Sequence, residues 1–306
     1  MHAHHAHHHD HGPHHGPVRG SAPRTFAIVT LVNLAYTVLE AGYGFLTGSL
    51  ALLSDALHNL GDVLGLALAW GAAAMAQWPP TERHTYGWRR ATLLSPLANA
   101  VLLVGLSGAL AWEAVRRMWA PPELPGLTII VVAAIGIAVN LGTALLVRGG
   151  HAHDLNRRGA FLHLMADAAI SLATVVAGAG MLAWGWDWLD PVTALLVGVV
   201  VAVGAIGLLR DSFDAAMDAV PAGIDAAEVR AFVEALPGVA SVHHLHIWSL
   251  GAGGVAMTVH LVRPGAGDDD AFIHEAAEAL EARFGINHAT LQVERARDAC
   301  GGRAHA

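Results

Sequence analysis

The chain has 306 residues, of which 54% are apolar and only 14% are charged, and its mean hydropathy is +0.47. Soluble domains usually carry about 25% charged residues, so this composition excludes an ordinary soluble protein and indicates an integral membrane protein. The single cysteine, Cys300, excludes internal disulfides and metal sites built from several thiolates. The net charge of −8 is uneven, because most acidic residues lie in the last hundred.

The chain begins with a histidine-rich head, in which the first fifteen residues hold nine histidines. Alanine and aspartate interrupt the histidines, and the spacing is irregular. This composition favours a disordered cytoplasmic tail over residues 1–22 that captures metal ions weakly at many points. The segment "HAHD" at 151–154 is expected to extend the same role. The alternatives are a solubilising tail without functional effect and an added purification tag.

Six apolar segments follow, and each is near the ~20 residues that cross a bilayer as a helix. They cover roughly residues 26–46, 50–77, 92–118, 126–147, 158–183 and 191–209. Prolines at 79–80, 121–122 and 191 mark the breaks between them. We therefore expect an α-helical polytopic membrane domain of six transmembrane helices over residues 23–211.

Arginines outside the spans indicate the orientation, because cytoplasmic loops carry an excess of positive charge. The arginines on the side of the N-terminus are Arg19, Arg24, Arg83, Arg89, Arg90, Arg148, Arg157, Arg158 and Arg210. The opposite side has only Arg116 and Arg117, at the end of the third span. Both termini are therefore expected in the cytoplasm.

From about residue 212 the chain is too charged to enter lipid. Its pattern predicts a helix in 224–239, strands in 240–250 and 254–263, a helix in 268–285 and a strand in 287–294. This α-β-β-α-β order is typical of a small α+β sandwich with helices on one face of a sheet. We place this cytoplasmic domain at 212–297, followed by a disordered tail at 298–306.

Two of the apolar spans contain the same polar pair. His58 and Asp62 lie in the second span, and His163 and Asp167 lie in the fifth. Residues i and i+4 share a helix face, and an Asp at mid-membrane costs about 2.5–3.5 kcal/mol on insertion scales. Two imidazole nitrogens and two carboxylate oxygens suit a tetrahedral Zn²⁺ site. The alternative for each pair is a local hydrogen bond that tightens helix packing, but two copies in separate spans favour a metal site.

Five motifs together resemble the cation diffusion facilitator (CDF) family. They are "SLALLSDALHNLGD", "RHTYGW", "HLMAD", "VHHLHIW" and "HATLQVE", and the resemblance covers about residues 25–295. It implies a dimeric six-helix transporter that exports Zn²⁺ or a related divalent cation in exchange for protons. It also implies a cytoplasmic domain with a ferredoxin-like (metallochaperone-like) fold and a location in the bacterial plasma membrane. The family's transport site falls on His58, Asp62, His163 and Asp167. With a histidine at position 58, the chain is similar to the zinc-preferring members of the family.

The resemblance implies further metal sites. Between spans two and three, Glu82 and His84 match a second site, although Trp88 stands where those members have a histidine. In the cytoplasmic domain, the positions that match a regulatory site are His243, His260 and His274, with His246, His288 and Glu294 as further candidate ligands. The alternative is that these are ordinary half-buried histidines.

Four further charged residues lie in or beside the spans. Arg90 and Asp218 lie at positions that resemble a charge interlock of family dimers. Asp55 lies one turn before His58, and Glu40 lies in the first span. For Glu40 two roles stay open, namely a place on a proton path or a place in the lining of the cytoplasmic cavity.

Charge balance at the four membrane ligands suggests how protons and metal would exchange. Two carboxylates neutralise a bound Zn²⁺, and without the ion they leave two negative charges in a poorly solvated site. Protonation of His58 and His163 would compensate, because imidazole titrates near physiological pH. Metal and protons then compete for the same nitrogens.

The chain lacks the sequence motifs of other membrane-protein classes. The chain has no His-Glu-x-x-His of a membrane metalloprotease and no lysine for a nucleotide-binding phosphate loop. We therefore expect no enzyme, no catalytic residues, no resident cofactor and no nucleic-acid partner, with Zn²⁺ as cargo and regulatory ligand. A passive metal channel and a membrane-anchored metal sensor stay open as alternatives. Ligand type alone does not rank Zn²⁺, Cd²⁺, Co²⁺, Mn²⁺ and Ni²⁺.

Overall fold

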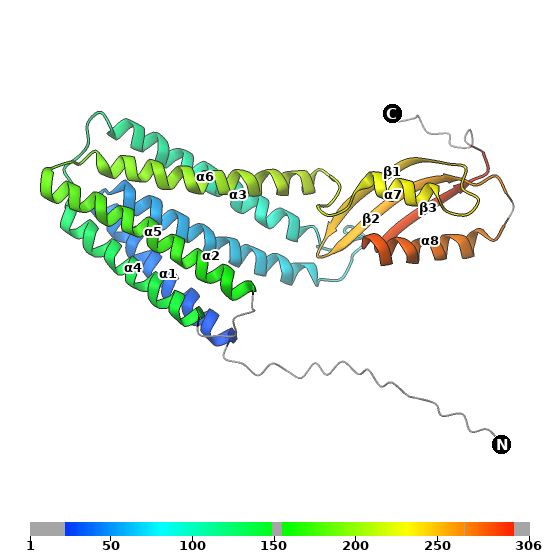
Figure 1. Ribbon diagram of the computed structural model, residues 1–306, viewed down its shortest axis with the longest axis horizontal. Helices are drawn as coiled ribbons and strands as arrows, with labels where there is room; N and C mark the ends of the chain where they lie inside the picture. Colours follow the sequence, from blue (N-terminus) through cyan, green and yellow to red (C-terminus); the bar gives the residue numbers. More distant parts are fainter. Residues whose placement is uncertain (1–21, 149–154, 266, 297–306) are drawn as a thin grey trace, which may run out of the picture.

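The structure, a computed structural model, describes residues 22–148, 155–265 and 267–296. The histidine-rich head, the segment 151–154 and Cys300 lie outside these residues. The chain forms a bundle of long helices with a smaller α+β domain at one end (Figure 1).

The bundle has six helices, and each is long and apolar enough to cross a bilayer. They are α1 (Ala22–Thr47), α2 (Leu50–Ala76), α3 (Ala91–Arg117), α4 (Gly126–Arg148), α5 (Leu155–Trp184) and α6 (Leu189–Ala216). The six predicted spans are thereby confirmed. Helix α6 continues past the predicted end at residue 209 through Arg210 and Asp211, because a helix satisfies its own backbone in water as well as in lipid.

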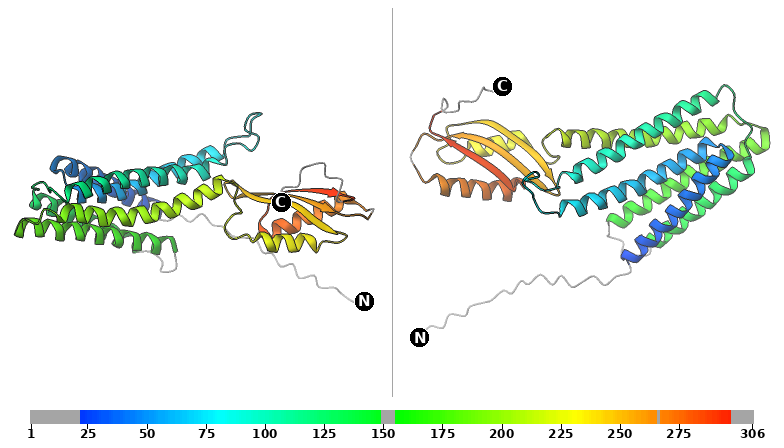
Figure 2. Two further views of the ribbon diagram at one scale, coloured as in Figure 1. Left: turned by 90° about the horizontal axis from the view of Figure 1, so that it is seen from above. Right: turned by 180° about the vertical axis from the view of Figure 1, so that it is seen from behind.

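The helices pack in two groups. Helix α4 packs mainly on α5, and α3 packs mainly on α6, while α2 contacts α1, α3, α5 and α6 (Figures 1 and 2). Small residues allow a close approach between α4 and α5: a Cβ on Gly126 would lie 2.9 Å from the carbonyl oxygen of Gly178. Such contacts between small residues are a common packing device between membrane helices. Helix α2 is thus the central element of the bundle.

A buried carboxylate fixes the start of α2. Asp190, near the start of α6, is fully buried. It accepts hydrogen bonds from Ser49 Oγ (2.5 Å) and from the backbone nitrogens of Leu50 (2.8 Å) and Ala51 (3.1 Å). The first N–H groups of a helix have no partner within the helix, so Asp190 caps α2 and joins it to α6. This contact lies at the end of the bundle that is farthest from the α+β domain (Figure 1).

The α+β domain has the predicted α-β-β-α-β order. It consists of α7 (Ala226–Glu234), β1 (Ser241–Gly251), β2 (Gly254–Val262), α8 (Asp269–Phe284) and β3 (His288–Glu294). The sheet order is β1-β2-β3, with β1 antiparallel and β3 parallel to β2. Helix α7 ends at Glu234, before the predicted Pro237-Gly238 stop, because proline disfavours helical backbone in the residue before it.

Helices α7 and α8 cover one face of the sheet (Figure 1). The core residues between the helices and this face are Val229, Val233, Ile247, Met257, Val259, Leu261, Phe272, Ala276, Leu280, Ile286 and Leu291. Successive side chains of a strand point to opposite faces. His260, between Val259 and Leu261, and Glu294 therefore lie on the other face, which carries the polar side chains.

The two parts of the chain meet at the start of α3. The backbone nitrogen of Ala252, in the β1–β2 turn, donates to Thr92 Oγ1 at 2.9 Å. Arg90 and Asp218 form an ion pair at 2.9 Å, and about half of each side chain is exposed. The predicted pairing of these two residues is present within one chain. It joins the start of α3 to the segment that follows α6.

Candidate metal site

The two His-x-x-x-Asp pairs face each other across α2 and α5. His58 Nε2 lies 3.2 Å from Asp167 Oδ1, and His163 Nε2 lies 3.1 Å from Asp62 Oδ2. His163 Nε2 also lies 3.7 Å from Asp167 Oδ2 on its own helix. The shortest contacts of both histidines therefore run between the helices, and local hydrogen bonding within a helix does not explain the arrangement.

The spacing suits a tetrahedral ion. Ligand atoms about 2.0–2.1 Å from Zn²⁺ lie roughly 3.3 Å from one another in a tetrahedron. The three His–Asp separations of 3.1, 3.2 and 3.7 Å are close to this value. Two imidazole rings on such an ion have centroids roughly 5 Å apart, and the rings of His58 and His163 are 6.0 Å apart.

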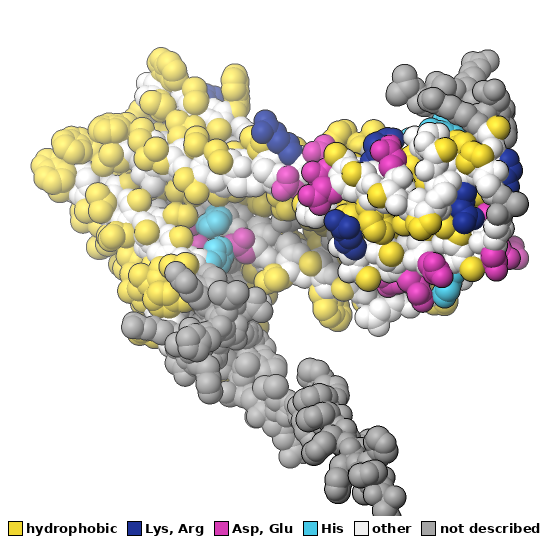
Figure 3. Space-filling view, turned by 45° about the vertical axis from the view of Figure 1, so that its right-hand side comes forward, with side chains coloured by type: hydrophobic (Ala, Val, Ile, Leu, Met, Phe, Trp, Pro, Cys, Tyr) yellow, Lys and Arg dark blue, Asp and Glu magenta, His cyan; other side chains and the backbone are white. Residues whose placement is uncertain are grey.

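The four side chains differ in burial. Only 4% of the Asp167 side chain and 19% of the His58 side chain are exposed. For His163 and Asp62 the exposed fractions are 46% and 45%. The two exposed residues are those nearer the α+β domain, because α2 runs toward that domain and α5 runs away from it (Figure 1). The site is therefore open toward this end, where histidine and acidic side chains gather in a recess of the bundle (Figure 3).

A second polar layer lies on the closed side of the four residues. Ser171 Oγ donates to Asp55 Oδ2 at 2.9 Å, one turn beyond Asp167. Glu40 accepts from Tyr36 OH at 2.7 Å and from Asn59 Nδ2 at 3.3 Å. Both carboxyl groups are fully buried. The sequence indicates Asp55 and Glu40 as separate intramembrane carboxyl groups. Asn59 has no sequence signal besides its place four residues after Asp55.

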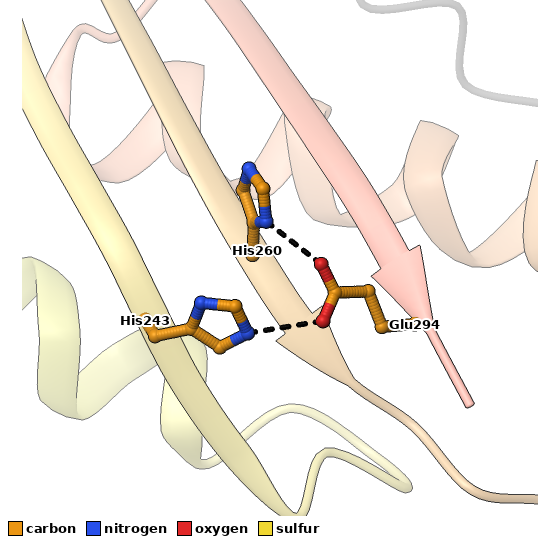
Figure 4. Close-up of side chains that lie close together, drawn as sticks. All are labelled: His243, His260 and Glu294. Carbon is orange, nitrogen blue, oxygen red and sulfur yellow. Dashed lines mark hydrogen bonds and ion pairs between the residues drawn. The ribbon is translucent and has the colours of Figure 1, made fainter. Parts of the chain in front are cut away.

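The α+β domain contains a second candidate metal site on the polar face of its sheet. His243 Nε2 lies 3.0 Å from Glu294 Oε2, and His260 Nδ1 lies 2.8 Å from Glu294 Oε1 (Figure 4). The candidate ligand atoms of these three residues all lie within 4.8 Å of one another. The rings of His243 and His260 are 5.1 Å apart, which matches the separation of about 5 Å expected for two imidazoles on one tetrahedral ion.

The electrostatics of this cluster favour an ionised carboxylate. Burial by itself would raise the pKa of Glu294, but the hydrogen bonds and charges of His260 and His243 outweigh it, and the pKa lies below its usual range. A metal ligand must be deprotonated. Glu294 is therefore held in the form that binds a cation.

The other predicted ligands lie elsewhere in the single chain. His274 is on α8, pairs with Glu278 at 3.3 Å and is 75% exposed. It is not in the cluster of His243 and His260, where Glu294 takes the third position. The ring of His288 contacts Tyr86 at the junction between the domains, with 5.6 Å between the ring centroids. The roles of His274 and His288 stay predictions.

In the loop between α2 and α3, His84 stacks on Trp88, with ring centroids 4.4 Å apart. Trp88 thus occupies the space beside His84 where the family resemblance implies a histidine ligand. Metal binding by Glu82 and His84 stays a prediction.

Comparison with known proteins decides the family. Residues 26–215 match the cation efflux transmembrane domain, and residues 221–296 match the cytoplasmic domain of cation efflux proteins. The chain belongs to the cation efflux family. It is a membrane transporter of that family and not an enzyme, and its α+β domain is cytoplasmic.

Several cation efflux proteins are similar over most of their length. The cation efflux system protein CzcD of Alcaligenes sp. (strain CT14) is 35% identical over 279 residues, which cover 90% of this chain and 88% of the relative. The zinc transporter ZitB of Escherichia coli is 36% identical over 265 residues, or 86% of this chain and 84% of ZitB. A cadmium, cobalt and zinc/H(+)-K(+) antiporter of Bacillus velezensis is 33% identical over 290 residues, which cover 92% of this chain and 91% of the relative.

Among solved structures, the metal-bound C-terminal domain of CzcD from Cupriavidus metallidurans is 39% identical. It covers 23% of this chain and 99% of its own, with a TM-score of 0.22.

Proposed function

We propose that this cation efflux protein exports Zn²⁺ from the cytoplasm in exchange for protons, through His58, Asp62, His163 and Asp167. The observation that carries the proposal is the pair of His–Asp contacts between α2 and α5, at 3.2 and 3.1 Å. The names of the relatives support it, because ZitB is a zinc transporter and the Bacillus relative is a cadmium, cobalt and zinc antiporter.

The donor set supports Zn²⁺ as cargo. Two imidazole nitrogens and two carboxylate oxygens in a tetrahedron suit Zn²⁺, whereas Mg²⁺ and Ca²⁺ prefer sites made of oxygen atoms alone. Co²⁺ and Cd²⁺ accept similar ligands, so we expect them as weaker or alternative cargo. The two carboxylates balance the charge of one divalent ion, and the loaded site is neutral.

The open and closed sides of the site support alternating access rather than a passive channel. Asp62 and His163 are open toward the cytoplasmic domain. On the other side, Asp55 and Asp190 are fully buried, and Asp190 joins the start of α2 to α6. A cation that enters from the cytoplasm therefore meets a closed bundle beyond the site. Release to the other side requires a second conformation.

We further propose that His243, His260 and Glu294 bind Zn²⁺ as a regulatory ligand of the cytoplasmic domain. Their short contacts and the ionised state of Glu294 support this role. In this proposal the protein works as a homodimer, which static light scattering of the detergent-solubilised protein would detect. A monomer under all metal conditions would contradict the dimer.

Transport by the full chain in sealed proteoliposomes tests the function. A proton gradient should drive Zn²⁺ uphill, and the apparent affinity should fall below about pH 6, because protons compete for the imidazoles. His163→Ala should abolish this flux. Downhill flux that ignores the proton gradient would indicate a channel. The absence of any flux, with Zn²⁺ still bound, would indicate a sensor.

A further inference from the structure

Two fully buried carboxyl groups lie together in the second polar layer. Glu40 is on α1 and Asp55 is on α2, and the two carboxyl groups lie close enough to share a hydrogen bond if one of them holds a proton. Three side-chain donors surround the pair: Tyr36 OH and Asn59 Nδ2 donate to Glu40, and Ser171 Oγ donates to Asp55. Four carboxyl oxygens therefore share three donors from other residues.

The carboxyl oxygen that is left without a donor in the described part of the chain, Asp55 Oδ1, indicates where a proton is bound. Asp55 Oδ1 is buried and has no hydrogen-bond partner among the donors of the described residues. Two buried carboxyl groups in contact cannot both be ionised, since like charges repel strongly away from water. A proton shared between Glu40 and Asp55 removes one negative charge and gives Oδ1 its partner.

Few charged groups face this pair. Its hydrogen-bond donors are Tyr36 from α1, Asn59 from α2 and Ser171 from α5. The charged groups that face it without a hydrogen bond are His58 on α2 and Asp167 on α5. Helix α4 contributes Gly136, where a Cβ would lie 2.2 Å from Tyr36 OH and would displace it. Among the described residues named here, only His58 can carry a positive charge. The main source of positive charge near the pair is therefore the transport site, one helical turn away.

The pair lies between the transport site and the closed end of the bundle. Asp55 precedes His58 by three residues on α2, which runs toward the cytoplasmic domain. Ser171 follows Asp167 by four residues on α5, which runs away from it. A cation that leaves to the extracytoplasmic side passes this layer, and so does a proton that enters from that side.

We propose that the Glu40–Asp55 pair is a proton-carrying site of the antiporter, separate from the four metal ligands. The proposal rests on the proposed function. A divalent ion in the transport site favours the ionised pair, so the carboxylic O–H gives its proton to water on the cytoplasmic side. When the ion leaves, a proton from the extracytoplasmic side restores the shared O–H. Binding of one ligand thus weakens binding of the other, and the effect is reciprocal.

The test compares Glu40→Gln with the wild-type full chain. The glutamine amide still donates a hydrogen bond to Asp55 but cannot exchange a proton. Calorimetric titration of Zn²⁺ in two buffers of different ionisation enthalpy counts the protons released. Zn²⁺ bound elsewhere on the chain contributes equally to both proteins and cancels in the difference. Asp190→Asn is the matched control, because it removes a buried carboxylate that has no contact with the pair.

We expect Glu40→Gln to bind Zn²⁺, to release about one proton fewer per ion than the wild type, and to lose uphill transport driven by protons. Asp55→Asn should do the same and gives the answer if Glu40→Gln does not fold, while Asp190→Asn should keep the wild-type proton count. Wild-type proton release by both pair variants, with uphill transport intact, would overturn this inference alone. If the wild type itself releases no protons and shows no uphill transport, the proposed function is wrong and the inference with it.

Discussion

Among the four residues proposed as membrane ligands, Asp167 is the one that contacts both histidines. Its two oxygens lie 3.2 Å from His58 Nε2 and 3.7 Å from His163 Nε2, and its side chain is nearly buried. Asp62 contacts His163 alone and is about half exposed. Removal of one partner from a buried pair costs more than removal from an exposed one, since the remaining group is left without water or partner.

Asp167→Asn should therefore weaken Zn²⁺ binding to the membrane domain more than Asp62→Asn. A change to a group that only orients a ligand typically costs 10–100-fold in metal affinity. Since Asp167 is proposed as a direct ligand, its loss should cost at least about 100-fold. Isothermal titration of the two variants in detergent measures the difference. Equal losses of Zn²⁺ affinity in the two variants would show that the burial of a carboxylate does not determine its contribution to binding.

Glu294 makes the stability of the cytoplasmic domain depend on pH. Its pKa is lowered in the folded domain, whereas an unfolded chain has a glutamate pKa of about 4.3. The folded state is therefore stabilised above about pH 4.3, and this contribution is lost as the pH falls through the lowered pKa. In metal-free buffer, Glu294→Gln should melt below the wild type at neutral pH and approach it in acid. Circular dichroism follows the melting, and a constant difference at all pH values would contradict the prediction.

At the scale of elements, the site depends on how closely the helices approach. Helix α5 carries two of the proposed ligands and packs mainly on α4. At Gly178 of α5, an added Cβ would lie 2.9 Å from Ile130 Cγ1 and 3.2 Å from the carbonyl oxygen of Gly126. Backbone atoms cannot yield as a flexible side chain can, so α4 and α5 would have to separate.

Gly178→Ala should therefore lower both the thermal stability in detergent and the transport rate. Gly142→Ala on α4 is the matched control, because nothing lies within 4 Å of an added Cβ there. Overpacking of this kind typically costs about 1–3 kcal/mol. Scanning fluorimetry and Zn²⁺ flux measure the two effects. An unchanged Gly178→Ala protein would show that the α4–α5 contact is not tight in the membrane.

At the scale of the whole molecule, the two domains are joined near the start of α3. The β1–β2 turn bonds to Thr92, and Arg90 pairs with Asp218. Exposed ion pairs contribute only about 0–1 kcal/mol to the free energy of folding. We therefore expect this pair to affect the arrangement of the two domains more than the stability of the fold. Asp218 has a φ of +60°, a left-handed conformation that asparagine and aspartate tolerate better than other side chains.

Charge reversal at Asp218 would therefore add backbone strain to the loss of the pair, and a double-mutant cycle with Arg90→Gln and Asp218→Asn is the cleaner test. Each single change should slow Zn²⁺ transport, and the double variant should be no slower than either one. High salt should reduce the difference from the wild type. Additive effects of the two changes would mean that the contact does not couple the domains in the working protein.

Much of this protein follows from the sequence by itself. Six apolar segments of membrane length determine six helices, and alternating polar and apolar residues determine the α-β-β-α-β order, because each pattern reflects local geometry. The i, i+4 spacing places His58 beside Asp62 on one helix face and His163 beside Asp167 on another.

Only the tertiary structure decided which of these groups meet. His58 pairs with Asp167 and His163 with Asp62, since the packing of α2 against α5 sets contacts that neither helix determines. Parallel pairing of β2 with β3 brings Glu294 to His260, whereas from the sequence Glu294 was only one of several further candidate ligands. The contact between Glu40 and Asp55 likewise depends on α1 and α2 lying side by side. Residues far apart in the chain share no periodic signal, so their contacts appear only when the helices and strands pack.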